Sequence, residues 1–228
     1  MQIPQCSQCA HSPAFTIVTE SSRRTTLRTL CHDDENDIGS DKTASQTISL
    51  LLKHSAMSTS YELLYFPLRG RAEPIRLVFA LAKVAYTNTG VTNWPEMKPK
   101  MPLGQMPVLI ERDGSGERQI AQSGAIIRHL ARVFDLYGAD EAHKTQADFI
   151  AETAIDWRGK FAPVQFAGFM NTDKSVIEKY WTDLPTTLAL FDRLLGDNDF
   201  FAGKSATYAD AIVFDTLDGN VGLKADCA

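Results

Sequence analysis

Gln105-Met106-Pro107-Val108-Leu109-Ile110 places a proline directly ahead of an apolar β run. Proline cannot donate to a sheet ladder, so it belongs at the first residue of a strand or at a sheet edge. Met106, the residue before it, is restricted to extended backbone. If the Met106–Pro107 bond is cis, the N–H and C=O of Met106 face outward and can pair with an extended peptide as a short antiparallel strand.

A second feature follows one hairpin later, at Ala121-Gln122-Ser123-Gly124. The intervening Asp113-Gly114-Ser115-Gly116 is typical of a hairpin turn. We expect Ser123 to cap a helix that runs to about Phe134, and the free N–H groups at its start favour a carboxylate. Together the two features predict a slot for a small, anionic, peptide-like ligand.

The composition is that of an ordinary globular protein, with room for one large domain or two small ones. The chain has 228 residues, 44% apolar and 22% charged, with a formal net charge of -5. This balance argues against a nucleic-acid surface, and no apolar run reaches transmembrane length. No cysteine lies between Met57 and Asp226, which favours a reducing, cytoplasmic location.

Residues 1–58 differ from the rest in being rich in Ser, Thr and Gln, with one acidic run. We expect a disordered N-terminal extension here, with Met57 as a candidate true start. Cys6-x-x-Cys9 with His11, and Cys31-His32, contain residue types that bind zinc. Their spacing is not that of a standard zinc finger, so no metal site is predicted.

The remaining chain begins with an α/β part. A β run at 61–66, a helix opened by Glu73-Pro74 and a second strand at 85–89 predict a β-α-β unit with a right-handed crossover. The hairpin and the helix from Ser123 complete the order β-α-β, then β-β-α. We expect these elements to form one small α/β domain over residues 59–136.

After a linker at 135–140 the apolar spacing is helical only. The expected helices are 144–169, then 176–196 with Pro185 bending or dividing it, and a third from a capping box at Thr207 and Asp210 to about Leu217. These define an all-helical domain over residues 142–228.

Several motifs carry a family likeness. Tyr65-Phe66-Pro67-Leu68-Arg69-Gly70-Arg71 and Ile127-Arg128-His129-Leu130-Ala131-Arg132 look like the pi class of cytosolic glutathione S-transferases. Trp94-Pro95-Glu96-Met97-Lys98 is similar to the sigma class, and Gly104-Gln105-Met106-Pro107 with Gln122-Ser123 matches both. The chain from about Tyr61 onward therefore resembles the tyrosine-type transferases, with the choice between pi and sigma left open. The resemblance implies a thioredoxin-like N-terminal domain, a helical C-terminal domain and a homodimer.

The reaction implied by the resemblance is attack of the glutathione thiolate on a small hydrophobic electrophile, as in detoxification. The thiolate is the nucleophile, and glutathione enters as a co-substrate without a metal. By resemblance Tyr65 donates its hydroxyl proton to the sulfur and favours the charged form. Arg71 adds positive potential and positions Tyr65, or else mainly locks the turn. Arg69 is expected to be a solvated turn residue or a structural ion pair.

The resemblance also assigns the two ends of glutathione. The glycyl carboxylate would meet Trp94, Lys98 and Gln105, and the cysteinyl unit would pair with the backbone of Met106 ahead of Pro107.

The γ-glutamyl carboxylate would bind Gln122 and Ser123 at the helix start. Asp156 of the partner subunit would receive the ammonium group, unless Asp156 is simply a surface carboxylate paired with Lys160.

The electrophile pocket is assigned to four residues, Phe66, Leu68, Ala162 and Phe166. Ala162 and Phe166 lie one helical turn apart and can share a face. The pi class has a tyrosine where Phe166 stands, so a hydroxyl toward epoxides and Michael acceptors is lost. Arg128 and Arg132 face Asp148 and Glu152 across the dimer interface, or are solvated helix charges.

The C-terminus departs from the family pattern, because the chain stops where the family continues into its final helices. We therefore expect a truncated helical domain in which Tyr208, Ile212, Val213 and Phe214 are poorly covered. Two other functions stay open for this reason. One is a non-catalytic protein that binds glutathione or hydrophobic ligands, and the other is a glutathione-dependent isomerase or peroxidase.

Overall fold

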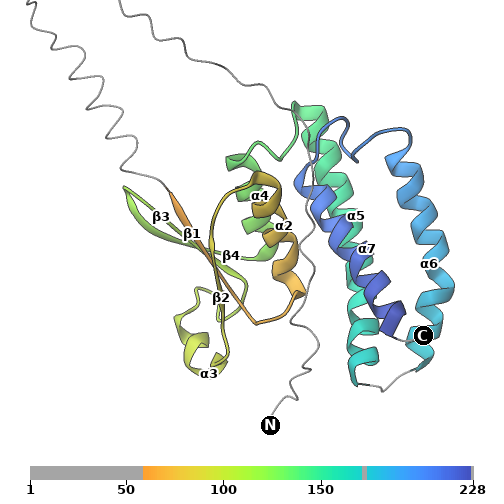
Figure 1. Cartoon of the computed structure of the whole chain (residues 1–228), viewed down its shortest axis with the longest axis horizontal. Coiled ribbons are helices and arrows are strands. Elements are labelled where there is room, and N and C mark those ends of the chain that lie inside the picture. Colours follow the sequence, from red (N-terminus) through yellow and green to blue (C-terminus); the bar gives the residue numbers. More distant parts are fainter. Residues whose placement is uncertain (1–58, 171–173, 227–228) are drawn as a thin grey trace, which may run out of the picture. The chain divides into compact units, whose positions relative to one another are not determined.

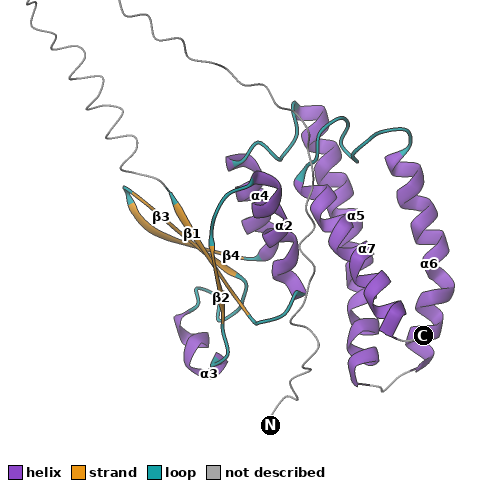
Figure 2. Cartoon of the chain, viewed as in Figure 1, coloured by secondary structure: helices purple, strands orange, loops and turns teal. Residues whose placement is uncertain are grey.

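The computed structural model describes residues 59–170 and 174–226 (Figure 1). The predicted N-terminal extension lies outside the described residues, and so do its cysteine and histidine motifs and Cys227. Within the described ranges the chain forms a four-stranded sheet with short helices, followed by three long helices (Figure 2).

The sheet has the order β2-β1-β3-β4. Its strands are β1 (Ser60–Tyr65), β2 (Thr87–Gly90), β3 (Val108–Asp113) and β4 (Gly116–Ala121). β1 pairs parallel with β2 and antiparallel with β3, and β4 returns antiparallel along β3. The predicted β-α-β unit and hairpin are thus both confirmed.

β2 begins two residues later than the sequence predicts. The helix before it, α2 (Glu73–Ala82), ends at Lys83 in the left-handed region, where φ is 56°. The ring of Tyr86 then stacks on Phe79 with centroids 4.2 Å apart. The residues expected to open the strand therefore pack onto the helix, and the ladder starts only at Thr87.

The two faces of β1 belong to different cores, because successive side chains point to opposite sides of a strand. Tyr61, Leu63 and Tyr65 join the main core with α2 and α4 (Ser123–Val133). Leu64 joins a smaller cluster on the other face, which α3 (Trp94–Met97) and the short turn η2 (Lys98–Lys100) adjoin. Figure 1 shows α3 on the side of the sheet away from α2 and α4.

The long helices are α5 (Glu141–Met170), α6 (Lys174–Leu195) and α7 (Tyr208–Asp226). α5 packs against both α6 and α7, and α7 also packs against α2. Pro185 lies inside α6, so of the two predicted alternatives the divided helix is wrong and the bent helix stays a prediction. Pro163 likewise lies inside α5. No helix of the described part is both long and apolar enough to span a membrane.

The capping box ahead of α7 is confirmed by the contact between Thr207 and Asp210. The Asp210 carboxylate accepts hydrogen bonds from the backbone N–H of Thr207 at 2.7 Å and from its hydroxyl at 2.8 Å. The same side chain accepts from the N–H of Phe201 at 3.0 Å. α7 then continues to Asp226, well beyond the predicted end near Leu217.

The expectation of a poorly covered α7 is wrong for three residues and confirmed for one. Tyr208, Ile212 and Val213 are 0%, 3% and 1% exposed, whereas Phe214 is 56% exposed. The first three face α5, α2 and α4, which already surround α7 on those sides. Phe214 lies on the opposite side of the helix.

Candidate active site

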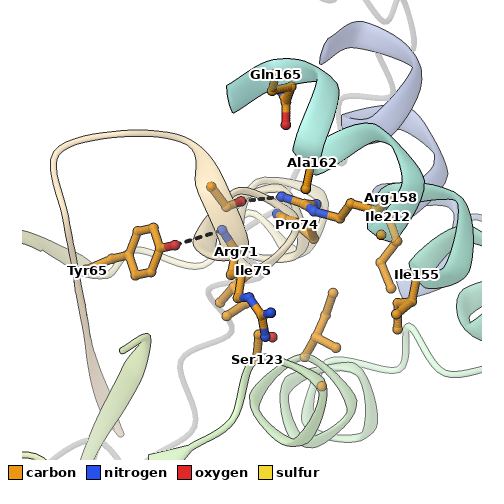
Figure 3. Close-up of a pocket in the computed structure, with 14 residues that line it drawn as sticks. Tyr65, Arg71, Pro74, Ile75, Ser123, Ile155, Arg158, Ala162, Gln165 and Ile212 are labelled. Carbon is orange, nitrogen blue, oxygen red and sulfur yellow. Dashed lines mark hydrogen bonds between the residues drawn. The ribbon is translucent and has the colours of Figure 1, made fainter. Parts of the chain in front are cut away.

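A pocket of about 330 Å³ lies between the end of β1 and α5 (Figure 3). Its walls come from Tyr65, the turn η1 (Gly70–Ala72), the starts of α2 and α4, and one face of α5. Most of the lining surface is apolar, and the polar side chains include Tyr65, Arg71, Ser123 and Arg158. The arrangement offers a phenol and two guanidinium groups beside an apolar surface.

Tyr65 is held at the pocket by the turn that follows it. Its hydroxyl accepts a hydrogen bond from the backbone N–H of Arg71 at 3.0 Å (Figure 3). A tyrosine hydroxyl can accept and donate at once, so the bond to Arg71 leaves the O–H proton for a ligand. The ring is otherwise buried, with 7% of the residue exposed. The phenol is therefore a fixed hydrogen-bond donor.

Gly70 makes this placement possible. Its φ is +43°, and a Cβ there would lie 2.6 Å from the Tyr65 hydroxyl oxygen. No L side chain fits this close approach without moving the phenol.

Arg71 contributes to the site in two ways. Its N–H holds the Tyr65 hydroxyl, while its exposed side chain lines the same pocket. Both of its expected roles, positive potential and locking of the turn, are compatible with this geometry. Arg69, by contrast, is a structural ion pair, with Asp215 at 3.0 Å and Asp218 at 2.6 Å.

The start of α4 differs from the prediction in one detail. The N-cap is Gln122, and Ser123 is the first helical residue. Gln122 has φ 72° and ψ 117°, a backbone conformation rare for a residue with a side chain. Such outliers persist only where the surroundings hold them, often beside a ligand site. Ser123 lines the pocket, so the start of α4 opens into it.

The Met106–Pro107 peptide bond is cis, as the conditional argument from the sequence required. Pro107 is buried directly ahead of β3, and Gln105 is exposed. Met106 is partly buried against both hydrophobic clusters.

Three aromatic rings lead from the pocket towards α3. Tyr65 meets Phe66 with centroids 5.6 Å apart, and Phe66 meets Trp94 at 5.5 Å. Trp94 opens α3, and Lys98 is exposed at the start of η2.

The structure brings Tyr65, Arg71, Ser123 and Ala162 together around the pocket. It does not place the other predicted electrophile residues among the pocket-lining ones. Leu68 is 55% exposed and Phe166 is 66% exposed, while Phe66 packs between Tyr65 and Trp94. Trp94 and Lys98 also lie outside this lining.

Sequence reasoning did not assign Ile155, Arg158 or Gln165, which α5 places in the wall. Arg158 lies four residues before Ala162, so helical spacing alone could have put both on one face.

Asp156 is exposed on α5, and among the described residues no cation lies within 4.0 Å of its carboxylate. The alternative pairing with Lys160 is therefore not formed. Arg128 contacts Asp148 at 3.1 Å and also Glu152, both within its own chain.

Asp148 is the centre of a polar network between α4, α5 and α7. It accepts hydrogen bonds from Tyr208, from Arg128 and, at 3.0 Å, from Tyr137. Burial alone disfavours the carboxylate, but these three donors outweigh it and lower the pKa of Asp148. Burial, reinforced by the same carboxylate, raises the pKa of the Tyr208 hydroxyl.

In the described ranges no cluster of three His, Cys, Asp or Glu side chains is arranged for a metal ion.

The fold defined by these elements is a thioredoxin-like domain joined to a helical domain, with a phenol at the end of the first strand. Two family descriptions match the chain: "Glutathione S-transferase, N-terminal domain" over residues 61–132 and "Glutathione S-transferase, C-terminal domain" over residues 155–227. The chain belongs to the glutathione S-transferase family.

Individual relatives agree with this assignment. The chain is 37% identical to glutathione S-transferase P of Caenorhabditis elegans over 163 residues, which are 69% of this chain and 75% of that protein. It is 38% identical to haematopoietic prostaglandin D synthase of Gallus gallus over 66% of this chain and 74% of the relative. The solved glutathione S-transferase of Ascaris lumbricoides superposes with a TM-score of 0.65 at 30% identity, covering 72% of this chain and 82% of that one.

Proposed function

We propose that the chain catalyses attack of the glutathione thiolate on small hydrophobic electrophiles in the pocket at Tyr65. The observation that carries this proposal is the Tyr65 hydroxyl, held by the Arg71 N–H beside an aliphatic wall. A free thiol has a pKa of about 8.5 and is mostly protonated at neutral pH. A fixed O–H donor stabilises the thiolate and raises the fraction of reactive nucleophile.

Glutathione fits the residues around this phenol. The start of α4 at Ser123 offers free N–H groups and a hydroxyl to the γ-glutamyl carboxylate. The backbone of Met106, ahead of the cis bond to Pro107, pairs with the cysteinyl unit. The glycyl carboxylate binds the side chains of Trp94 in α3, Lys98 in η2 and Gln105 ahead of β3.

The electrophile lies against the part of the pocket formed by α5 and α7. Ile155, Ala162 and Ile212 supply apolar contact area there. Gln165 and Arg158 are the polar side chains of α5 in this wall, and Phe166 supplies no hydroxyl to it. This composition favours apolar electrophiles over epoxides and Michael acceptors, which a tyrosine hydroxyl would assist by donating a hydrogen bond.

We further propose that the protein acts as a homodimer in the cytoplasm, with Asp156 of the partner subunit binding the glutathione ammonium. Asp156 is exposed and has no ion-pair partner among the described residues, which supports this role. A carboxylate of this kind gains a partner only when a cation arrives, either from a ligand or from another molecule.

A glutathione-dependent isomerase is the second candidate. It is supported by the likeness to a relative named haematopoietic prostaglandin D synthase. Isomerisation of an endoperoxide would use the same thiolate and the same apolar wall, so product analysis with a prostaglandin endoperoxide distinguishes it from conjugation.

The test is conjugation of glutathione to 1-chloro-2,4-dinitrobenzene by the full chain and by Tyr65→Phe. We expect Tyr65→Phe to lower kcat/KM by about 10- to 100-fold, because one donor to the developing anion is removed. Tyr86→Phe is the matched control, since Tyr86 stacks on Phe79 away from the pocket. Turnover by neither the wild type nor the variants, with retained binding to a glutathione resin, would instead identify a non-catalytic binding protein.

A further inference from the structure

Arg158 joins three parts of the molecule that lie far apart in sequence. Its guanidinium donates one hydrogen bond to the Asp215 carboxylate on α7. It donates another to the carbonyl oxygen of Gly70, 88 residues away, which Figure 3 marks with a dashed line. Asp215 also accepts from Arg69 at 3.0 Å. Arg158 itself extends from α5 into the wall of the pocket.

The carbonyl that Arg158 contacts belongs to the peptide unit that holds Tyr65. The Gly70 C=O and the Arg71 N–H are the two ends of one amide, and this N–H donates to the Tyr65 hydroxyl at 3.0 Å. A continuous series of hydrogen bonds therefore runs from the Asp215–Arg158 pair through one peptide group to the phenol. Hydrogen bonds in such a series polarise one another, and a cation at the carbonyl makes the amide N–H a stronger donor.

Asp215 is suited to hold Arg158 in this position. Only 6% of its side chain is exposed, and it lies between two guanidinium groups. Burial opposes its ionisation and raises the pKa of Asp215, while Arg158 and Arg69 favour the charged form. A guanidinium can serve the carboxylate and the carbonyl together because its donors are arranged in a rigid fork.

We propose that Arg158 is a positioning residue for the transferase reaction: through the Gly70–Arg71 peptide it orients and polarises the donor to Tyr65, and so sets the acidity of the bound glutathione thiol. The proposal rests on the proposed function, because it presumes that Tyr65 binds the thiolate. It differs from a purely structural clamp between α5, α7 and the turn, which would affect stability alone.

The experiment measures the ionisation of the glutathione thiol on the full-length protein, from the ultraviolet absorbance of the thiolate as a function of pH. For Arg158→Gln we expect the pKa of the bound thiol to rise by about half to one unit. kcat/KM at neutral pH should then fall by about 3- to 10-fold, with KM for glutathione changed less than about 2-fold. Arg158→Lys should lie between Arg158→Gln and the wild type, because the ammonium keeps the positive charge but lacks the rigid planar fork that faces both partners.

The matched control is Arg69→Gln. Arg69 shares Asp215 with Arg158 but its guanidinium does not contact Gly70, so this variant should leave the thiol pKa unchanged. If Arg158→Gln does not fold, the double variant Arg158→Met with Asp215→Leu replaces the pair without leaving a buried charge, and the same rise in thiol pKa is expected.

Two failures can be told apart. A wild-type protein that does not acidify the bound thiol would overturn the proposed function itself. A wild type that does so, together with a folded Arg158 variant whose thiol pKa is unchanged, would overturn only this inference and leave Arg158 as a structural clamp.

Discussion

The backbone N–H of Arg71 lies 3.0 Å from the hydroxyl oxygen of Tyr65, and a Cβ added at Gly70 would lie 2.6 Å from the same oxygen. A strand end and the turn that follows it thus position one phenol from two sides. The bond uses an acceptor site of the hydroxyl and leaves its proton available. The proposed activation of a thiol by Tyr65 depends on this local geometry.

Gly70→Ala should damage the site more than it damages the fold. The new Cβ would lie 2.6 Å from the Tyr65 hydroxyl oxygen and would push the phenol out of place. We expect kcat/KM to fall by about 10-fold or more, with a loss of unfolding free energy of about 1–3 kcal/mol from the positive φ.

Gly116→Ala separates these two effects. Gly116 also has a positive φ, 133°, but a Cβ there would meet nothing within 4 Å. It should lose a similar amount of stability in urea unfolding and keep its activity. Equal losses of activity in the two variants would show that the contact with Tyr65 is unimportant.

Acid should destabilise the protein partly through Asp148. Although burial acts against it, hydrogen bonds from Tyr208, Arg128 and Tyr137 lower the pKa of Asp148 in the folded state. Its stabilising contribution is therefore complete above the unfolded pKa of about 3.9 and is lost as the pH falls through the lower folded value.

Asp148→Asn should reduce unfolding free energy by about 1–2 kcal/mol at pH 7, a modest value because the carboxylate is partly exposed to solvent. The difference from wild type should shrink as the pH approaches 3, measured by urea unfolding across the acid range. Asp183→Asn, which breaks only the exposed pair with Lys179, should change little at any pH. If the difference in unfolding free energy between wild type and Asp148→Asn stayed constant with pH, the pKa of Asp148 would not be lowered by folding.

Val213 and Phe214 are neighbours on α7 with opposite surroundings. Val213 is 1% exposed and Phe214 is 56% exposed. Val213→Ala should cost about 1.5–3 kcal/mol of unfolding free energy, because it removes buried methyl groups and leaves a cavity. Phe214→Ala should cost less than about 1 kcal/mol, despite its larger change in size. Thermal unfolding of both variants checks the order, and a larger loss at Phe214 would mean that another surface covers this side of α7.

The proposed role of Asp156 in the partner's site can be tested by mixing two defective variants. Tyr65→Phe and Asp156→Ala are unfolded together, refolded and assayed with the electrophile. In a mixed dimer, one site combines an intact Tyr65 with an intact Asp156 from the other subunit. Random pairing should restore about a quarter of the sites. Activity that merely equals the sum of the separate variants would place Asp156 in its own subunit's site or outside any site.

The elements that the sequence predicted correctly are those with a local cause. β1 follows from its short apolar run, the hairpin from its glycine-rich turn, and the α7 start from the Thr207–Asp210 box. The cis bond at Pro107 was a condition in the sequence argument and not a prediction, and the structure supplies it. Errors of a few residues arose where packing took over, as at Tyr86, whose ring stacks on Phe79 and delays β2.

The sequence alone thus determined the order of the elements, the family likeness and the place of Tyr65 at the end of a strand, because each depends on residues close together in the chain. Only the tertiary structure decided which side chains surround that phenol. Arg158 reaches the Gly70 carbonyl from 88 residues away, and Arg128 pairs with Asp148 inside its own chain. Such contacts depend on how α5 and α7 pack against the turn and against α4. They join residues far apart in the sequence, so no local pattern predicts them.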